Sequence, residues 1–446
     1  MTPRLFGTDG IRGAAGTFPL DPPTVARIGA ALVRAWPAGA PPPAIIVGRD
    51  TRESGVWIEH ALAEGATSQG ASVTSVGVAP TPAVAYLAAS ARFGLGVVVS
   101  ASHNPYADNG IKVFDADGVK FDDRREDELS RVILDESWSV ATGSLEMTAD
   151  PALLDRYLDH LRDILPDPSP LGPMRLGIDC ANGATSRVAS HLFRGLGFDV
   201  QAIGCEPDGR NINDDCGSTH PERLAQLVTT RRCRMGVAFD GDGDRVTFVD
   251  AEGRIVDGDA VLFVCARDLQ RQGQLRGNAI VATVMSNVGL EMALRALGVD
   301  LARCAVGDKH VVELLRARQL ALGGEQSGHV IFPDVMPTGD GLVTTLMVLR
   351  AVAASGRSLG ELAADLTVYP QVLVNVRVRE KADLQSVPAV AATVRDVEAR
   401  LEGQGRLLVR YSGTEPLLRI MLEGRNQDAI DAWAEEIAAV VRRELG

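Results

Sequence analysis

The chain has 446 residues, with 45 lysines and arginines against 58 aspartates and glutamates, which gives a formal net charge of −13. Its composition, 46% hydrophobic and 23% charged, is that of an ordinary globular protein. The acidic balance argues against a protein that coats nucleic acid or an anionic membrane, but it allows a small anion in a locally basic cleft. The sequence shows no apolar segment of membrane length, no signal-peptide core and no cysteine pattern typical of disulfides or zinc. We therefore expect a cytoplasmic protein.

Short apolar runs alternate with amphipathic stretches along most of the chain, a pattern typical of α/β proteins. Because the runs are apolar nearly throughout, they predict strands that are covered on both faces. The predicted strands are Ala44–Val47, Gly96–Val99, Arg175–Ile178, Met235–Phe239 and Ala279–Val284. Each run opens into small polar residues, at the strand end where open α/β sheets bind their ligands. These segments read GRDTRES, SASHNP, DCANG, DGDGDR and MSN.

A helix is predicted to follow Asp150, with that residue as N-cap, Pro151 at the first helical position and an apolar stripe from Leu153 to Leu165. The proline-rich segment 166–173 after it indicates a domain boundary.

The last part of the chain has a different pattern. Valines alternate with polar residues from Val372 to Val378, which predicts a half-exposed antiparallel strand. We therefore expect a separate C-terminal domain that begins near Val368. A helix that carries Ile430, Trp433, Ile437 and Val440 is predicted to close this domain.

The segment DGDGDR places Asp240, Asp242 and Asp244 at alternate positions directly after a predicted strand. Two glycines let the backbone curl so that three carboxylates converge on one hard cation. An EF-hand is excluded, because Arg245 stands where that loop needs glycine and Ala251 where it needs glutamate. A solvated acidic turn is the alternative. Three carboxylates together favour a metal site, and magnesium is the expected ion.

The segment SASHNP exposes Ser102 at the end of another predicted strand, where a serine can act as nucleophile or phosphate carrier. A capped turn explains the same residues. A Ser-His-Asp triad fits poorly, because Ser102 and His103 are adjacent and are expected to point apart, and the chain has no GxSxG motif. Lys112, further along, is a candidate acid, base or phosphate ligand, or a surface lysine.

Two further segments concentrate polar groups between apolar runs. The first, 410–419, predicts a phosphate cradle, because guanidinium groups match phosphate and a glycine-opened loop adds amide donors; a hairpin with a polar tip is the alternative. Its candidate ligands are Arg410, Ser412, Thr414 and Arg419. The second, GGEQSGH, places Glu325 and Ser327 where both can bind sugar hydroxyls, with His329 as a proton shuttle or phosphate ligand.

Near the N-terminus, Arg12 lies on a glycine-flanked turn or in a strand.

The motifs FGTDGIRG, SASHNP, DGDGDR, GEQSGH and RYSGTEP, in this order and spacing, resemble those of the α-D-phosphohexomutase superfamily. The resemblance extends from Phe6 to about Gly424. It implies three related mixed α/β domains and a smaller α+β C-terminal domain around a central active-site cleft. The implied domains are 1–150 with the phosphoserine, 151–253 with the metal, 254–366 with the sugar loop and 367–446 with the phosphate clamp.

The resemblance also implies roles for individual residues. Ser102 corresponds to the superfamily's phosphoserine, and Asp240, Asp242 and Asp244 correspond to the three magnesium ligands, with a phosphoserine oxygen as a further ligand. The basic residues around the transferring phosphoryl group are Arg12, Lys112, Arg245 and His329. Sugar binding is implied for Glu325 and Ser327. The clamp on the non-reacting phosphate is implied for Arg410, Ser412, Thr414 and Arg419.

The implied reaction interconverts glucosamine 6-phosphate and glucosamine 1-phosphate through a 1,6-bisphosphate, which supplies amino sugar for cell-wall precursors. One Mg²⁺ per chain, a hexosamine phosphate substrate and no nucleic-acid or membrane partner are expected, and the resemblance is compatible with a homodimer. Activity on glucose or mannose phosphates is the alternative within the superfamily. A sugar phosphatase with an aspartate nucleophile and a non-catalytic sugar-phosphate sensor are the alternatives outside it.

Overall fold

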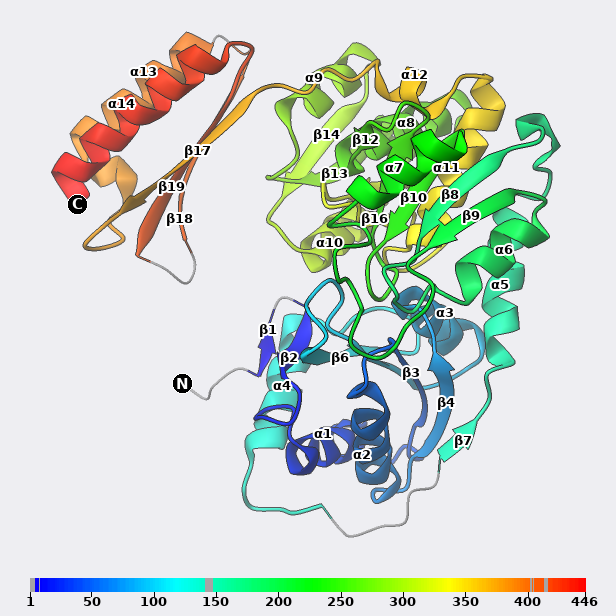
Figure 1. Ribbon diagram of the computed structural model, residues 1–446. Helices are drawn as coiled ribbons and strands as arrows, with labels where there is room; N and C mark the ends of the chain where they lie inside the picture. The colour runs from blue at the N-terminus through cyan, green and yellow to red at the C-terminus, as the bar shows by residue number, and fades with distance from the viewer. Residues whose placement is uncertain (1–4, 8, 141–146, 402, 404, 413–415) are drawn as a thin grey trace. The chain divides into compact units, whose positions relative to one another are not determined.

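The computed structural model describes residues 5–7, 9–140, 147–401, 403, 405–412 and 416–446. The chain divides into two compact units (Figure 1). The first comprises Met1–Met285 and Val299–Ala364, and the second comprises Ser286–Gly298 and Asp365–Gly446. Among the described residues the strands form three mixed sheets in the first unit and an antiparallel sheet in the second.

The first sheet of unit 1 has its central strands parallel and its β1-β2-β6 edge antiparallel. Its spatial order is β1 (Phe6–Gly7), β2 (Gly10–Ala14), β6 (Asp108–Phe114), β5 (Leu95–Val99), β3 (Ala44–Arg49), β4 (Ser72–Val78) and β7 (Met147–Ala149). The helices of this region are α1 (Pro22–Arg34), α2 (Gly55–Thr67), α3 (Thr81–Ser90), α4 (Asp123–Leu134) and α5 (Leu153–Ile164).

Both faces of this sheet are buried, because successive residues of a strand point to opposite sides. Ile45 and Val47 of β3 pack in one core with α1, α2 and α4. Ile46, between them, packs in a second core with α3, against which the start of α5 lies. The strand is therefore apolar throughout, as the sequence predicts for a strand covered on both faces.

The second sheet carries three parallel strands and two antiparallel ones. Its order is β12 (Ile255–Val256), β11 (Val246–Asp250), β10 (Met235–Phe239), β8 (Arg175–Asp179) and β9 (Asp199–Ile203). The helices are η1 (Ser169–Leu171), α6 (Val188–Gly195) and α7 (Glu222–Arg231). The segment 240–245 is the turn between β10 and its antiparallel partner β11.

The third sheet joins three parallel strands to the antiparallel β16. Its order is β14 (Asp300–Cys304), β13 (Ala279–Thr283), β15 (Gly323–Gly324) and β16 (Val330–Ile331). Its helices are α8 (Gly258–Arg271), η2 (Arg276–Asn278), α10 (Asp308–Arg318), α11 (Gly341–Ser355) and α12 (Leu359–Ala363). The turn between β15 and β16 contains Glu325 and Ser327, which places the predicted sugar loop at the end of a parallel strand.

Unit 2 packs helices on the sheet β17-β19-β18. Its elements are α9 (Val288–Ala296), β17 (Gln371–Arg377), η3 (Leu384–Ser386), α13 (Pro388–Leu401), β18 (Arg406–Tyr411), β19 (Leu417–Glu423) and α14 (Gln427–Leu445). The buried Glu423 carboxylate accepts hydrogen bonds from the Val288 backbone (3.0 Å) and from Arg406 Nε (3.0 Å). This explains why 286–298, which the sequence does not assign to the C-terminal region, belongs to this unit.

The predicted strands are all present within a residue or two, as is the predicted C-terminal helix with Ile430 and Ile437 buried. The predicted start of the helix after Asp150 is wrong. This helix, α5, begins at Leu153, and no side chain caps it. Asp150 continues the edge strand β7 instead, since its N–H donates to the Ser75 carbonyl of the neighbouring β4 (2.8 Å). Asp150 is therefore part of the sheet edge and not of the helix.

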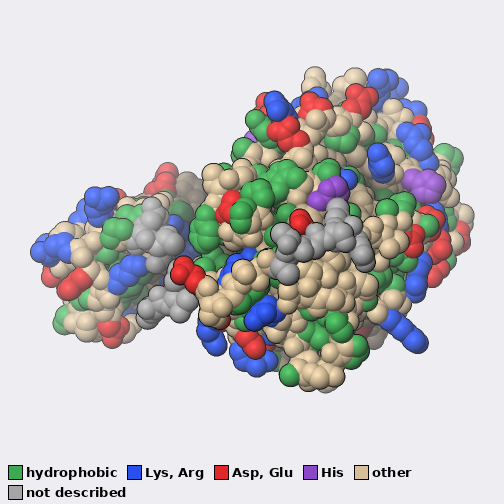
Figure 2. All heavy atoms as spheres, turned by 90° about the horizontal axis from the view of Figure 1, so that it is seen from below, with side chains coloured by type: hydrophobic (Ala, Val, Ile, Leu, Met, Phe, Trp, Pro, Cys, Tyr) green, Lys and Arg blue, Asp and Glu red, His purple; other side chains and the backbone are tan. Residues whose placement is uncertain are grey.

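Acidic and basic side chains are intermixed among the described residues of the face shown in Figure 2. Apolar side chains gather there in several small groups. Among the described residues, every helix is too short or too polar to cross a membrane.

Candidate active site

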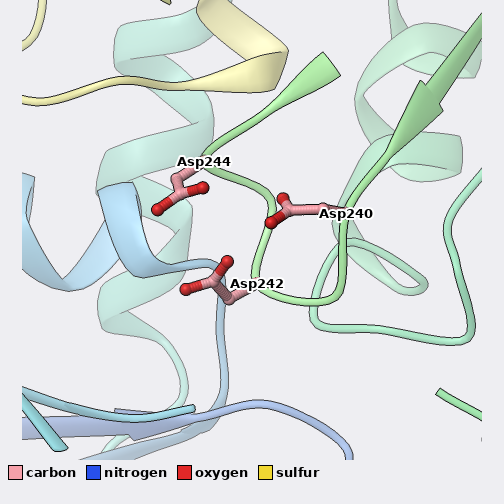
Figure 3. A group of neighbouring side chains, drawn as sticks. All are labelled: Asp240, Asp242 and Asp244. Atoms are coloured by element: carbon pink, nitrogen blue, oxygen red, sulfur yellow. The ribbon is translucent and has the colours of Figure 1, made fainter. Parts of the chain in front are cut away.

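The three aspartates of the β10–β11 turn converge (Figure 3). One carboxylate oxygen from each of Asp240, Asp242 and Asp244 lies within 4.8 Å of those of the other two. All three residues are buried, at 1%, 0% and 4% exposure. Gly243 between them has a φ of +76°, and a Cβ at this position would lie 2.6 Å from Thr185 Cγ2, so the turn requires glycine here.

This cluster is suited to a divalent cation. Neither Asp242 Oδ1 nor Asp244 Oδ1 accepts a hydrogen bond from the described residues, although both atoms are buried. Burial and the neighbouring carboxylates of Asp244 and Asp242 raise the pKa of Asp240 well above its usual value. Buried carboxylate oxygens without donors have lost water without replacing it, and a hard cation would supply the missing interaction.

Ser102 lies beside this cluster, and its Oγ donates a hydrogen bond to Asp240 Oδ2 over 2.5 Å. The serine follows β5 with a φ of +53°, a conformation that non-glycine residues adopt rarely. Its backbone N–H donates to Ser100 Oγ (3.0 Å), which in turn donates to Asp50 Oδ2 (2.6 Å). The buried loop after β3 therefore holds the serine loop after β5.

Arg52, which is not among the predicted site residues, organises the same loop. It is 1% exposed and pairs with Asp50 through Nε (2.8 Å). Its guanidinium also donates to the carbonyls of Ser102 (3.0 Å) and Asn104 (2.8 Å). The segment GRDTRES could have indicated this role, because it places an acid and a base directly after a buried strand. The partners lie about fifty residues further on and come together only in the fold.

Lys112 reaches the aspartates from β6 and is fully buried. Its Nζ lies 2.8 Å from Asp242 Oδ2, 3.1 Å from Asp244 Oδ2 and 3.1 Å from Asp9 Oδ2. Burial alone would lower the pKa of this lysine, but the surrounding carboxylates reverse the effect and raise it well above its usual value. The interpretation of Lys112 as a surface lysine is therefore wrong.

Arg12 lies on β2, the predicted N-terminal strand, beside Asp9 and Asn104. Its guanidinium forms an ion pair with the Asp9 carboxylate and donates to Asn104 Oδ1 over 3.3 Å. Since Asn104 belongs to the serine loop, this contact ties Arg12 to the same site.

The expectation that Ser102 and His103 point apart is wrong. His103 Nδ1 lies 3.3 Å from Ser102 Oγ and 3.4 Å from Arg245 Nη1. The left-handed conformation of Ser102 turns the chain so that neighbouring side chains face one space. Burial and the charges of Arg245 and Arg12 lower the pKa of His103, which favours a neutral imidazole beside the serine.

His329 approaches the cluster from the loop before β16. Its Nδ1 lies 3.6 Å from Asp244 Oδ1, and the residue is buried. Burial would lower its pKa, but the Asp244 carboxylate raises it above the usual value. Gly339 faces the imidazole, and a Cβ there would lie 2.3 Å from Nε2, so the close approach depends on glycine.

Glu325 and Ser327 line a cleft of about 540 Å³ together with Arg245. The Glu325 carboxylate accepts a hydrogen bond from the Gly307 backbone (3.2 Å), which holds it in the cleft wall. Unit 1 thus brings the predicted serine, aspartates and basic residues together, and the predicted sugar loop shares Arg245 with them.

The remaining candidates lie in unit 2. Arg410 on β18 and Arg419 on β19 are direct cross-strand partners, so their side chains share one face of the sheet. The Ser412 N–H donates to the Leu417 carbonyl (2.8 Å) across the base of the turn. The hairpin that the sequence allowed as the alternative is therefore present, and its strands place both arginines together. The phosphate cradle remains a prediction, and its candidate Thr414 lies outside the described residues.

Family models match the chain over most of its length. They are the phosphoglucomutase/phosphomannomutase alpha/beta/alpha domains I (residues 3–139), II (155–253) and III (257–369) and the C-terminal domain (373–440). Together with the site geometry, these matches define a class of protein, and the chain belongs to the phosphoglucomutase/phosphomannomutase family.

Particular members of the family resemble the chain from end to end. The phosphoglucosamine mutase of Solibacter usitatus is 50% identical, with 100% of both chains covered. That of Syntrophotalea carbinolica is 45% identical, with 100% of this chain and 99% of the relative covered.

Solved structures agree in fold. A phosphoglucomutase/phosphomannomutase family protein from Burkholderia thailandensis has a TM-score of 0.81 at 25% identity, covering 99% of this chain and 98% of that one. The N-acetylphosphoglucosamine mutase of Aspergillus fumigatus, solved with GlcNAc-6P and magnesium, has a TM-score of 0.66 at 20% identity, covering 98% and 95%. The latter likeness concerns the fold alone.

Proposed function

We propose that this chain is an isomerase that interconverts glucosamine 6-phosphate and glucosamine 1-phosphate by intramolecular phosphoryl transfer. The observation that carries the proposal is the position of Ser102 Oγ, 2.5 Å from a carboxylate of the buried aspartate cluster. Full-length relatives named phosphoglucosamine mutase, at 50% and 45% identity, support the choice of sugar.

In the proposed reaction, Ser102 carries a phosphoryl group. The Oγ–P bond breaks while the free sugar oxygen forms a new O–P bond, and the proton of the sugar hydroxyl passes to a base. The product of this step is a 1,6-bisphosphate. The bisphosphate then reorients, and Ser102 Oγ takes the phosphoryl group from the other position, which regenerates phosphoserine and releases the isomer.

The basic residues around Ser102 are suited to balance the charge of the phosphoryl group. Arg12 and Arg245 supply guanidinium donors, and Lys112 supplies an ammonium group that three carboxylates keep protonated. His329 and His103 are the imidazoles at this site. We assign proton transfer to this pair because His329 lies against Asp244 and His103 lies against Ser102.

Asp240, Asp242 and Asp244 would hold one Mg²⁺, with an oxygen of phosphoserine 102 as a further ligand. When bound, the ion supplies positive charge that stabilises the transferring phosphoryl group. Arg410, Ser412, Thr414 and Arg419 are assigned to the phosphate that does not react, and Glu325 and Ser327 to the sugar hydroxyls. The domain division at 150/151, 253/254 and 366/367, the homodimer and the cytoplasmic location remain predictions of the same proposal.

The test is ³¹P NMR of purified protein with glucosamine 6-phosphate, Mg²⁺ and a hexose 1,6-bisphosphate primer. The expected result is an equilibrium mixture of the 6- and 1-phosphates. Steady release of inorganic phosphate would instead indicate a phosphatase. Binding without isomerisation would indicate a sensor, and a higher rate on glucose or mannose 6-phosphate would assign a different sugar.

A further inference from the structure

The cleft beside the sugar loop contains a carboxylate to which no role has been assigned. Asp257, at the N-terminus of α8, lines the cleft together with Glu325, Gln326 and Arg245. Its Oδ1 accepts from the Ala260 backbone (3.1 Å) and caps the helix. Its Oδ2 accepts from Gln326 Nε2 over 3.2 Å. One carboxylate therefore joins the helix cap to a side chain of the sugar loop.

The backbone supports the same junction. The Gly258 N–H donates to the Gln326 carbonyl over 3.0 Å. A Cβ on Gly258 would lie 2.2 Å from the Glu325 carbonyl oxygen, so the loop approaches α8 as closely as only glycine permits. On its other side, the Gly328 carbonyl accepts from the Val246 N–H (3.1 Å). The loop is therefore held at both ends, and the orientation of the Gln326 side chain is set by Asp257.

The contact with Asp257 decides which end of the Gln326 amide is available to a ligand. An ionised carboxylate can only accept hydrogen bonds, so the NH₂ group of the amide must face Asp257. The amide oxygen is then the end that remains for the cleft. Of the charged groups that line the cleft, Asp257 and Glu325 are negative and Arg245 is positive. This wall combines a fixed acceptor with negative charge, which complements a cationic donor.

We propose that Asp257 is a specificity-determining positioning residue, which turns the Gln326 amide oxygen toward the ammonium group of a 2-aminohexose phosphate. The inference rests on the proposed function and extends it, because it names the part of the substrate that this wall recognises. A 2-hydroxyl group is neutral and both donates and accepts, so it gains less from a wall of acceptors.

The test is the substitution Asp257→Asn, which keeps the size and the capping oxygen of the side chain. Its NH₂ group would face the NH₂ group of Gln326, and the glutamine amide would turn over to relieve the contact. A donor would then face the ammonium group. We expect kcat/KM for glucosamine 6-phosphate to fall about tenfold or more, through KM, as for loss of a hydrogen bond to a charged group. We expect the value for glucose 6-phosphate to change by less than about twofold.

A second substitution that restores the sugar preference distinguishes a change in the orientation of the Gln326 amide from general damage to the fold. In the double variant Asp257→Asn with Gln326→Glu, the asparagine NH₂ group can donate to one glutamate oxygen while the other oxygen faces the cleft. We expect the preference for glucosamine 6-phosphate to return. Should Asp257→Asn not fold, Gln326→Met in the otherwise native chain removes the acceptor directly and should reduce the same preference. Asp21→Asn is the matched control, because Asp21 caps α1 through the same kind of bond, to the Thr24 N–H.

The two proposals fail in different ways. A native chain that does not isomerise glucosamine 6-phosphate, or that isomerises glucose 6-phosphate faster, contradicts the proposed function. A native chain that prefers glucosamine 6-phosphate, with the same preference in folded Asp257→Asn and in Gln326→Met, overturns the inference about Asp257 alone.

Discussion

The aspartate cluster of unit 1 and the arginine hairpin of unit 2 are built in opposite ways. The cluster is buried, and segments as distant as Asp9, Ser102, Lys112 and Asp244 provide its side chains. The hairpin is local, because Arg410 and Arg419 face each other across two adjacent strands of one turn. Neither arginine is fully buried.

The difference teaches what each region can do. Fixed partners hold the buried charges of the cluster in place, so its geometry tolerates little change and suits bond-making. Two partly exposed arginines on one face of a hairpin can donate to a phosphate whose remainder varies. Substitutions should therefore affect turnover in the first region and binding in the second.

The largest effect is expected for Ser102→Ala. Without the hydroxyl there is no carrier, so turnover should fall by at least about a thousandfold, measured by ³¹P NMR with primer present. Ser355→Ala, at the end of α11, is the control and should retain full rate. Turnover near the native rate in the pure Ser102→Ala protein would exclude the serine as carrier.

The next effect is expected for the metal site. Asp242→Asn replaces a carboxylate that lies against Lys112 and Thr81 with a neutral amide. Magnesium affinity, measured by calorimetry, should weaken about a hundredfold, because the ion prefers charged oxygen ligands. The exposed Asp215→Asn should leave affinity unchanged. If magnesium dependence is the same in Asp242→Asn and the native chain, the ligand assignment is wrong.

A third prediction concerns stability. Asp340 caps α11 and accepts from Tyr157 Oη (2.7 Å), and burial raises its pKa from 3.8 to about 6. A carboxyl group whose pKa is raised by folding stabilises the folded state below pH 3.8. This contribution is lost as the pH rises through 6. The unfolding free energy should therefore fall by roughly 2 kcal/mol between pH 4 and 7 through this group.

Asp340→Asn should remove that part of the pH dependence while keeping the helix cap. Denaturant unfolding at pH 4 and pH 7, followed in both proteins, measures the difference. If the unfolding free energy changed equally between pH 4 and pH 7 in the native and Asp340→Asn proteins, this carboxyl group would not have a raised pKa.

The smallest effect is expected in the hairpin. Arg410→Gln should raise KM for the sugar phosphate about tenfold and change kcat by less than about twofold, since it removes one charged donor from a binding group. Arg395→Gln, an exposed arginine on α13, is the control. A loss of kcat as large as that of Ser102→Ala would contradict the division of roles between the two regions.

Some of this could be predicted from the sequence alone. The strands, the DGDGDR turn and the hairpin depend on residues close together in the chain, and local patterns carry enough information to predict them. The start of α5 was predicted wrongly because Asp150 is held by a neighbouring strand that its own segment does not reveal. His103 was misjudged because its direction depends on the left-handed conformation of Ser102.

The sequence by itself determined the periodicity of the elements, the three acidic residues at alternate positions and the chemistry that such residues favour. Only the tertiary structure decided that Lys112 is buried against those acids, that Arg52 holds the serine loop and that Asp257 meets Gln326. The reason is that these contacts join segments far apart in the chain. The spacing of residues in a sequence constrains neighbours within an element, whereas the packing of elements selects which distant side chains share a low-dielectric site.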